Sequence, residues 1–224
     1  MIASLDDGVA CQRCWDEAEN TRLNFDYCEK CDASLPRLQL RSQARRCGQC
    51  EELAFAAARA GGVYKGAIRE AVLSLKMQPH LPAQLVRLLC ETFWQLPQAS
   101  EISAILPVPL HHSRVQERGF NQAEVIANHL AGKLGLPVYP TAVRRQIVTE
   151  RHRAGMDAQA RLKSLADAFA VTAPRLIADQ TLLLVDDVMT TGSTAHELTV
   201  TLLNSGARAV NVLTVARAIT QFNS

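Results

Sequence analysis

Six of the seven cysteines lie within the first 50 residues, where they form three Cys-x-x-Cys pairs. Two intervening residues let one tight turn direct both sulfurs at a single ion, and two such turns supply the four thiolates that zinc prefers. The sequence therefore predicts a structural zinc site in a short ribbon or knuckle, and the metal would supply much of the folding free energy of so small a segment. The preferred ligands, chosen by proximity, are Cys11, Cys14, Cys28 and Cys31.

Two questions about the cysteines stay open at this point. Cys47 and Cys50 could replace the first pair as ligands, or they could remain free. A redox dithiol, or cysteines without a shared role, is the alternative to metal binding. Cys90 lies among Leu88, Leu89 and Phe93 and is expected to pack in a core.

A second group of residues that could do chemistry lies near the C-terminus. Asp186 and Asp187 follow the apolar run 181–185 and precede a loop of small hydroxyl residues around a glycine, which then leads into a predicted helix. Small side chains let backbone N–H groups curl around an anion at a helix N-terminus, where the helix dipole also favours negative charge. The carboxylates, in turn, can accept hydrogen bonds from sugar hydroxyls. An acid pair beside an anion cradle therefore predicts a site for a sugar phosphate. The loop residues are Thr190, Thr191, Gly192, Ser193 and Thr194.

The elements that must position these residues alternate between helix and strand. Strands are expected at 102–106, 136–139, 168–171, 181–185 and 209–215. Helices are expected at 68–76, 84–96, 121–134 and 195–204, with Asn121 as an N-cap, Gly135 as a stop and Lys76 at a surface helix end. Gly61-Gly62 is expected to break the chain, and the Arg-rich stretch 144–163 to form a surface excursion. This alternation predicts an α/β fold with a doubly wound parallel sheet.

Length and charge divide the chain into two expected domains, a cysteine-rich module at 1–52 and a larger domain at 53–224. The first part holds seven Lys/Arg and ten Asp/Glu, and the second holds seventeen and twelve, so the larger part is mildly basic and suits a phosphorylated ligand. No apolar run approaches the ~20 residues of a membrane span. Acidic Asp6 and Asp7 stand where a signal peptide would be basic and then apolar, so a soluble cytoplasmic protein is expected.

The residues quoted so far resemble a known family. Residues 183–194, LLVDDVMTTGST, resemble the 5-phosphoribosyl-1-pyrophosphate (PRPP) signature of type I phosphoribosyltransferases. The cysteine pairs, followed by 106–110 (LPVPL) and 118–122 (RGFNQ), make the whole chain similar to the ComF/GntX competence-protein family. That family often carries four cysteine pairs, whereas this chain has three. The resemblance implies a type I phosphoribosyltransferase-like parallel sheet with helices on both faces, plus a small N-terminal zinc module.

The resemblance also implies roles for individual residues. Asp186 and Asp187 would be the catalytic pair, facing the ribose 2- and 3-hydroxyls and stabilising an oxocarbenium-like transition state, while loop 190–194 would hold the ribose 5-phosphate. The turn formed by Pro107, Val108 and Pro109 would present backbone N–H groups to pyrophosphate, which Mg²⁺ would bridge to the ribose. Arg114 and Arg118 would neutralise charge on the leaving group.

The function implied is transfer of phosphoribose from PRPP to an unknown nitrogen acceptor, linked to DNA uptake or utilisation. The alternative is an accessory protein that senses PRPP or handles single-stranded DNA without turnover. Both readings place Zn in the cysteine module and Mg²⁺ with PRPP, and both leave single-stranded DNA or the DNA-uptake machinery as a partner.

Overall fold

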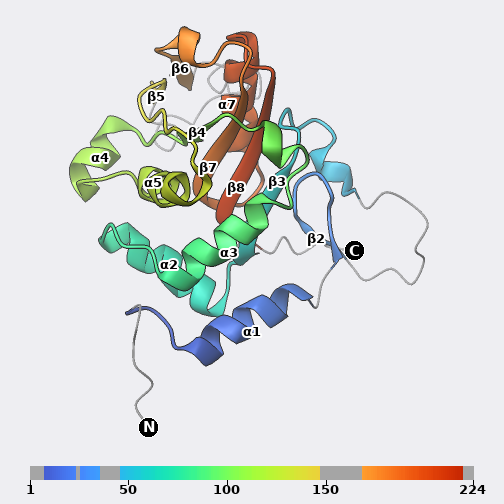
Figure 1. Cartoon of the computed structure of the whole chain (residues 1–224), viewed down its shortest axis with the longest axis vertical. Coiled ribbons are helices and arrows are strands. Elements are labelled where there is room, and N and C mark those ends of the chain that lie inside the picture. The colour runs from blue at the N-terminus through green and yellow to red at the C-terminus, as the bar shows by residue number, and fades with distance from the viewer. Residues whose placement is uncertain (1–7, 24–25, 36–45, 147–167, 219–224) are drawn as a thin grey trace, which may run out of the picture.

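A four-stranded parallel sheet forms the centre of the protein (Figure 1). The structure is a computed structural model that describes residues 8–23, 26–35, 46–146 and 168–218. The strand order is β3-β8-β7-β4. Their bounds are Ala58–Val63 for β3, Ala104–Pro107 for β4, Thr181–Met189 for β7 and Ala209–Arg217 for β8. The predicted α/β fold with a parallel sheet is confirmed.

Helices cover both faces of this sheet, which explains why the run 182–185 of the inner strand β7 is continuously apolar. Leu182 and Leu184 of β7 belong to one buried cluster, and Leu183 and Val185 belong to the other. The second cluster contains side chains of α1 (Gln12–Leu23), α2 (Gly66–Met77), α3 (Ala83–Phe93) and α5 (Gln122–Leu134). The first contains those of α7 (Ser193–Asn204) and of the cysteine-rich turns.

The elements outside this core are short. They are β1 (Asp26–Tyr27), β2 (Ser34–Leu35), α4 (His112–Arg118), β5 (Val143–Arg145) and β6 (Phe169–Val171), together with the 3-10 turns η1 (Gly48–Cys50), η2 (Ala99–Glu101) and η3 (Pro174–Leu176). β1 pairs with β2 and β5 pairs with β6, both antiparallel. Within the described ranges, no helix has both the length and the apolar character needed to cross a membrane.

Several sequence expectations need correction. The chain does not break at Gly61 and Gly62, because β3 continues through them. A Cβ on Gly61 would lie 3.0 Å from the carbonyl oxygen of Val215, and one on Gly62 would lie 2.9 Å from Ile68 Cγ1, so these glycines permit close packing against neighbouring elements. The strand expected at 136–139 is reduced to one parallel bridge between Ile105 and Val138. Most of the Arg-rich stretch lies outside the described residues.

The two expected caps of the helix that follows the RGFNQ segment are confirmed. The Asn121 side chain accepts a hydrogen bond from the N–H of Ala123 at the start of α5. Gly135 ends the same helix with a φ of 69°. These caps fix where α5 begins and ends, and its first turn borders the site described next.

Candidate functional site

The acid pair lies toward the carboxyl end of β7 and is held by its own backbone. The N–H of Asp187 donates to Asp186 Oδ1 at 2.8 Å, and the N–H of Val188 donates to Asp187 Oδ1 at 2.7 Å. Both residues are half-buried. Their carboxylates are therefore fixed at the edge of the sheet where ligands of open α/β folds bind.

The two carboxyl groups differ in their electrostatic surroundings. Burial, and after it the negative charge of Asp187, raise the pKa of Asp186 to about 8. The Lys76 ammonium lies 3.9 Å from Asp187 Oδ2. Asp186 can therefore carry a proton near neutral pH, beside a cation that faces Asp187. A strongly raised pKa in a cleft is typical of a functional site.

This pKa has a consequence for stability. Asp186 titrates at about 8 in the folded protein and at about 4 in an unfolded chain, so between these values the folded protein keeps a proton that the unfolded chain has lost. The stability due to this group is complete below the lower value and is lost as the pH rises through the higher one. We expect Asp186→Asn to raise the thermal unfolding midpoint most above pH 8 and least near pH 4.

Thermal unfolding across this pH range tests that prediction. Asp16→Asn is the matched control, because it replaces an exposed carboxylate on α1 that lines neither cavity of the site. An Asp186→Asn effect that is independent of pH would show that burial does not disfavour the charge of this carboxyl group.

The hydroxyl loop, residues 190–194, connects β7 to α7. Gly192 adopts a φ of 84°, in the left-handed region, and Thr191 Oγ1 lies 2.8 Å from Ser193 Oγ. Thr190, Thr191 and Ser193 are exposed. A small cavity of about 50 Å³ is lined by the whole loop and also by Asp186. Backbone N–H groups at the start of α7 make this cavity suited to an anion.

A larger cavity on the other side of the acid pair forms the cationic cleft, with a volume of about 260 Å³. Its charged lining residues are Lys76, Arg114, Arg118, Arg145, Asp186 and Asp187. His111, Asn121 and Gln122 also line it. The structure thus places Arg114 and Arg118, to which the resemblance assigns a role at the leaving group, in one cleft with the acid pair and with two further cations, Lys76 and Arg145. Asp186 borders both the hydroxyl loop and the cationic cleft.

The role expected for Pro107, Val108 and Pro109 must be corrected. The two prolines have no N–H group, and the N–H of Val108 donates to the carbonyl of Val185 at 2.9 Å. The Asn121 side-chain amide donates to the carbonyl of Val108 at 3.1 Å. This turn therefore has no N–H left for pyrophosphate. It instead joins β4 to β7 and fixes the start of α5 beside the cleft.

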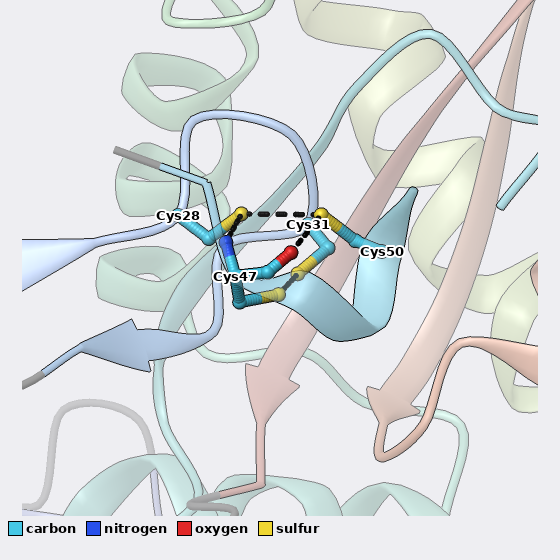
Figure 2. Close-up of side chains that lie close together, drawn as sticks. All are labelled: Cys28, Cys31, Cys47 and Cys50. Atoms are coloured by element: carbon cyan, nitrogen blue, oxygen red, sulfur yellow. Dashed lines mark hydrogen bonds between the residues drawn. The ribbon is translucent and has the colours of Figure 1, made fainter. Parts of the chain in front are cut away.

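Four of the cysteines form a compact cluster (Figure 2). The sulfurs of Cys28, Cys31, Cys47 and Cys50 all lie within 4.8 Å of one another, and all four residues are buried. Cys28 Sγ lies 3.4 Å from Cys50 Sγ, and Cys31 Sγ lies 3.3 Å from Cys47 Sγ. Four convergent thiols are the donor set of a structural zinc site. A hydrogen bond between the two side chains lowers the pKa of Cys28 and raises the pKa of Cys31, so Cys28 is the member of this pair that favours a thiolate.

The preferred ligand set is therefore corrected. Cys11 and Cys14 do not belong to this four-cysteine cluster, and Cys47 and Cys50 take their place, which is one of the alternatives that the sequence left open. The physical reason is the helix α1, which the sequence did not predict. Cys11 precedes α1 and Cys14 lies within it, whereas Cys28 and Cys31 lie at the turn between β1 and β2 and face η1.

Hydrogen bonds connect the cysteine-rich turns to the hydroxyl loop and to α7. The buried Arg217 guanidinium donates from Nε to the carbonyl of Cys31 at 3.2 Å and from Nη1 to the carbonyls of Met189 and Thr190. The N–H of Ala54, four residues after Cys50, donates to His196 Nδ1 of α7 at 3.0 Å. The cysteine-rich turns thus help to fix the positions of the hydroxyl loop and the first turn of α7.

This packing leaves little room for a side chain on the glycine of the loop, whose positive φ also disfavours any other residue. A Cβ on Gly192 would lie 3.3 Å from Leu53 Cδ1 and 3.6 Å from Phe55 Cε1. We expect Gly192→Ala to weaken binding of inorganic phosphate at least tenfold, because either the loop or Leu53 must move. Gly135→Ala is the matched control: its φ of 69° imposes similar strain, but nothing lies within 4 Å of its Cβ. Equal phosphate affinity in the two variants would contradict this role of the loop.

Sequence reasoning missed three cations of this region. Lys76 was expected at a surface helix end, Arg145 was assigned to a surface excursion, and Arg217 was not singled out. They lie on α2, β5 and β8, far in sequence from the acid pair, so no spacing links them to it. A lone basic residue on an element gives no sequence signal, and only the tertiary fold brings these residues together.

Comparisons with known proteins agree with this geometry. The family described as "Phosphoribosyl transferase domain" matches residues 96–221. Competence protein F of Haemophilus influenzae is 30% identical over 203 residues, which cover 87% of this chain and 86% of that protein. DNA utilization protein YhgH of Escherichia coli is 35% identical over 115 residues, which cover 51% of this chain and 49% of that protein.

A solved structure is also similar. The glutamine phosphoribosylpyrophosphate (PRPP) amidotransferase from B. subtilis matches 67% of this chain and 27% of its own, with 15% identity and a TM-score of 0.42. The assignment of a family rests on the two sequence comparisons, since one covers more than half of the chain and the other most of it. The chain belongs to the ComF family of proteins with a phosphoribosyltransferase domain.

Proposed function

We propose that this protein binds PRPP together with Mg²⁺ and transfers its phosphoribosyl group to a nitrogen acceptor. The observation that carries this proposal is the place of Asp186, which borders both the hydroxyl loop and the cationic cleft. PRPP has a phosphate at one end, a pyrophosphate at the other and a pentose between them. The arrangement of an anion loop, an acid pair and a cationic cleft matches that order of groups.

Each part of the site then has a role. The hydroxyl loop holds the 5-phosphate through backbone N–H and hydroxyl groups, and Asp186 and Asp187 accept hydrogen bonds from the ribose hydroxyls. Lys76, Arg114, Arg118 and Arg145 surround the space left for pyrophosphate. Mg²⁺, when bound with the substrate, neutralises pyrophosphate charge and suits this role because it retains water ligands and accepts phosphate oxygens.

In the transfer step the nitrogen of the acceptor attacks ribose C1. The bond from C1 to the pyrophosphate oxygen breaks, pyrophosphate leaves with the electron pair, and the acceptor nitrogen gives up a proton. Positive charge develops on the ribose ring in the transition state, where a preorganised carboxylate stabilises it. Asp187 supplies this stabilising negative charge. The raised pKa of Asp186 suits that residue to exchange a proton near neutral pH.

The four-cysteine cluster is proposed to hold a structural zinc ion. On this account residues 1–52 act as a metal module and residues 53–224 as the phosphoribosyltransferase-like unit. A cytoplasmic location belongs to the same proposal, because reducing conditions there keep thiols available for the metal.

The second candidate is an accessory protein that binds PRPP or single-stranded DNA without turnover. It is favoured by the names of the relatives, competence protein F and DNA utilization protein YhgH, which connect those proteins with DNA. Arg144 on β5 is exposed, so its guanidinium is accessible to a nucleic-acid phosphate.

Release of pyrophosphate from PRPP and Mg²⁺ separates the two candidates. The measurement uses the full chain with purine bases, pyrimidine bases and short single-stranded DNA as acceptors in turn. We expect release that depends on the acceptor and is lost in Asp186→Asn/Asp187→Asn. Binding of PRPP or of single-stranded DNA without release under every acceptor supports the accessory role, and the absence of release together with the absence of binding to either ligand contradicts both candidates.

A further inference from the structure

The cysteine pair that the four-cysteine cluster leaves out forms a second, separate group of thiols. Cys11 Sγ and Cys14 Sγ lie 3.5 Å apart, in hydrogen-bond contact. Cys14 is exposed and Cys11 is half-buried, whereas the four clustered cysteines are buried. These two sulfurs are therefore both close to each other and open to solvent.

The pair is held in place by a well-anchored helix. Trp15, the residue after Cys14, is 2% exposed and packs in the core. Near the other end of α1, the Arg22 guanidinium forms two hydrogen bonds of 3.0 Å with the buried carboxylate of Asp32. The Gln84 amide of α3 donates to Gln12 at 2.7 Å. The helix therefore fixes the position of Cys14, and the N–H groups of Cys14 and Trp15, which donate to the carbonyl of Cys11, fix that of Cys11.

Their positions on the helix make the two thiols unequal. The carbonyl of Cys11 accepts the N–H of Cys14 at 2.9 Å, so Cys11 stands at the N-terminus of α1, where partial positive charge favours a thiolate. The backbone N–H of Cys14 lowers the pKa of Cys11, and the neighbouring Cys11 side chain raises the pKa of Cys14. Cys11 is thus the better nucleophile, and Cys14 keeps its proton until a second step.

A cavity beside the pair gives access to a reaction partner. It has a volume of about 690 Å³ and lies between α1 and the start of α2, with both cysteines in its wall. Apolar Val9 and Ala67 line it together with Lys65 and Glu70. A small disulfide of amino-acid or peptide size fits a space of this volume.

We propose that Cys11 and Cys14 form a redox-active dithiol that exchanges with a small-molecule disulfide. The Cys11 thiolate attacks one sulfur of the disulfide, forms a mixed disulfide and releases one thiolate. Cys14 then gives up its proton and attacks the Cys11 sulfur, and the second thiolate leaves. Two protein thiols are oxidised to one disulfide, while one small disulfide is reduced to two thiols.

The full-length, metal-loaded protein and oxidised glutathione test this proposal. We expect the wild type to lose two accessible thiols, with peptide mapping that joins Cys11 to Cys14 and with unchanged metal content. Cys14→Ser should trap glutathione on Cys11, because the attack that resolves the mixed disulfide is missing. Cys11→Ser should react at least tenfold more slowly than Cys14→Ser. Cys90→Ser is the matched control and should behave as the wild type.

Three results would overturn the proposal. The first is oxidation of Cys11 and Cys14 no faster than modification of Cys90. The second is loss of metal during the reaction, which would place the reactive thiols in the four-cysteine cluster. The third is a lower metal content in Cys11→Ser/Cys14→Ser than in the wild type, which would make the pair a metal site.

Discussion

Removal of the proposed zinc ion from the four-cysteine cluster should lower the thermal unfolding midpoint and weaken PRPP binding at the same time. A structural zinc ion contributes about 10–16 kcal/mol of apparent binding free energy in small peptides, so a loss of about 5 kcal/mol here is a conservative expectation. For a chain of this size that loss corresponds to a fall of about 10–20 °C in midpoint. Chelation followed by calorimetry, with and without PRPP, measures both effects.

PRPP affinity should fall when the metal is removed, because Arg217 forms hydrogen bonds both to the cysteine cluster and to the hydroxyl loop. Its guanidinium donates to the carbonyl of Cys31 on one side and to those of Met189 and Thr190 on the other. Hydrogen bonds to charged groups contribute about 1.5–3 kcal/mol each, so loss of the link should weaken PRPP binding about tenfold or more. Arg217→Met should show the same loss of affinity while it keeps the metal.

Cysteine variants provide the control for this prediction. Cys28→Ser should lose the metal, whereas Cys11→Ser/Cys14→Ser should keep it, since these two cysteines lie outside the cluster. A chelated protein that binds PRPP as tightly as the loaded protein would refute the link between cluster and loop. Loss of metal in the double variant would restore the ligand set first chosen from the sequence.

Replacing the acid pair should weaken PRPP binding by at least about tenfold and leave inorganic phosphate binding intact. In Asp186→Asn/Asp187→Asn the ribose hydroxyls lose the charged acceptor of Asp187, at a cost of roughly 1 kcal/mol or more for each bond exchanged for a neutral one, and they also lose the carboxyl oxygens of Asp186. Inorganic phosphate has no ribose, and its site in the hydroxyl loop is unchanged. Titration calorimetry with both ligands gives the ratio of the two effects.

A second effect acts in the opposite direction. Removing negative charge should favour any anion, because two unit charges about 8 Å apart interact by about 2 kcal/mol at an effective dielectric constant of about 20. Two observations reduce this term. Asp186, with a pKa of about 8, is largely protonated near neutral pH, and Lys76 already faces Asp187. The loss of ribose contacts should therefore dominate.

Asp179→Asn serves as the control for the acid-pair variant, since Asp179 is an exposed carboxylate that pairs with Arg208 and does not line either cavity. It should leave both affinities unchanged. Equal weakening of PRPP and phosphate in the acid-pair variant would show a general disturbance of the loop. Unchanged PRPP affinity would show that the carboxylates do not contact the ribose.

Local patterns in the sequence predicted a large part of this molecule. The apolar run 181–185, the acid pair and the hydroxyl loop form one continuous segment, so strand, site and helix could be read together. The cap at Asn121 and the stop at Gly135 were readable because capping depends on neighbouring residues.

Features that depend on distant contacts were not predictable. The sequence of β3 contains Gly61 and Gly62, which are more typical of a turn than of a strand. It forms a strand because it pairs with β8, which lies near the other end of the chain. The ligand set of the cluster was misjudged because proximity in sequence favoured Cys11 and Cys14, while the turn at Cys28 and Cys31 meets η1 in space. The prediction that the Pro107–Pro109 turn binds pyrophosphate through backbone N–H groups was wrong for a simpler reason, since the only N–H of this turn donates within the sheet.

The most direct test of the proposed function is a crystal structure of the full chain with PRPP and Mg²⁺. We predict density for the 5-phosphate within the hydroxyl loop, with the ribose hydroxyls against Asp186 and Asp187 and the pyrophosphate between Lys76 and the arginines of the cationic cleft. An empty loop under saturating PRPP, or carboxylates turned away from the pentose, would contradict the account.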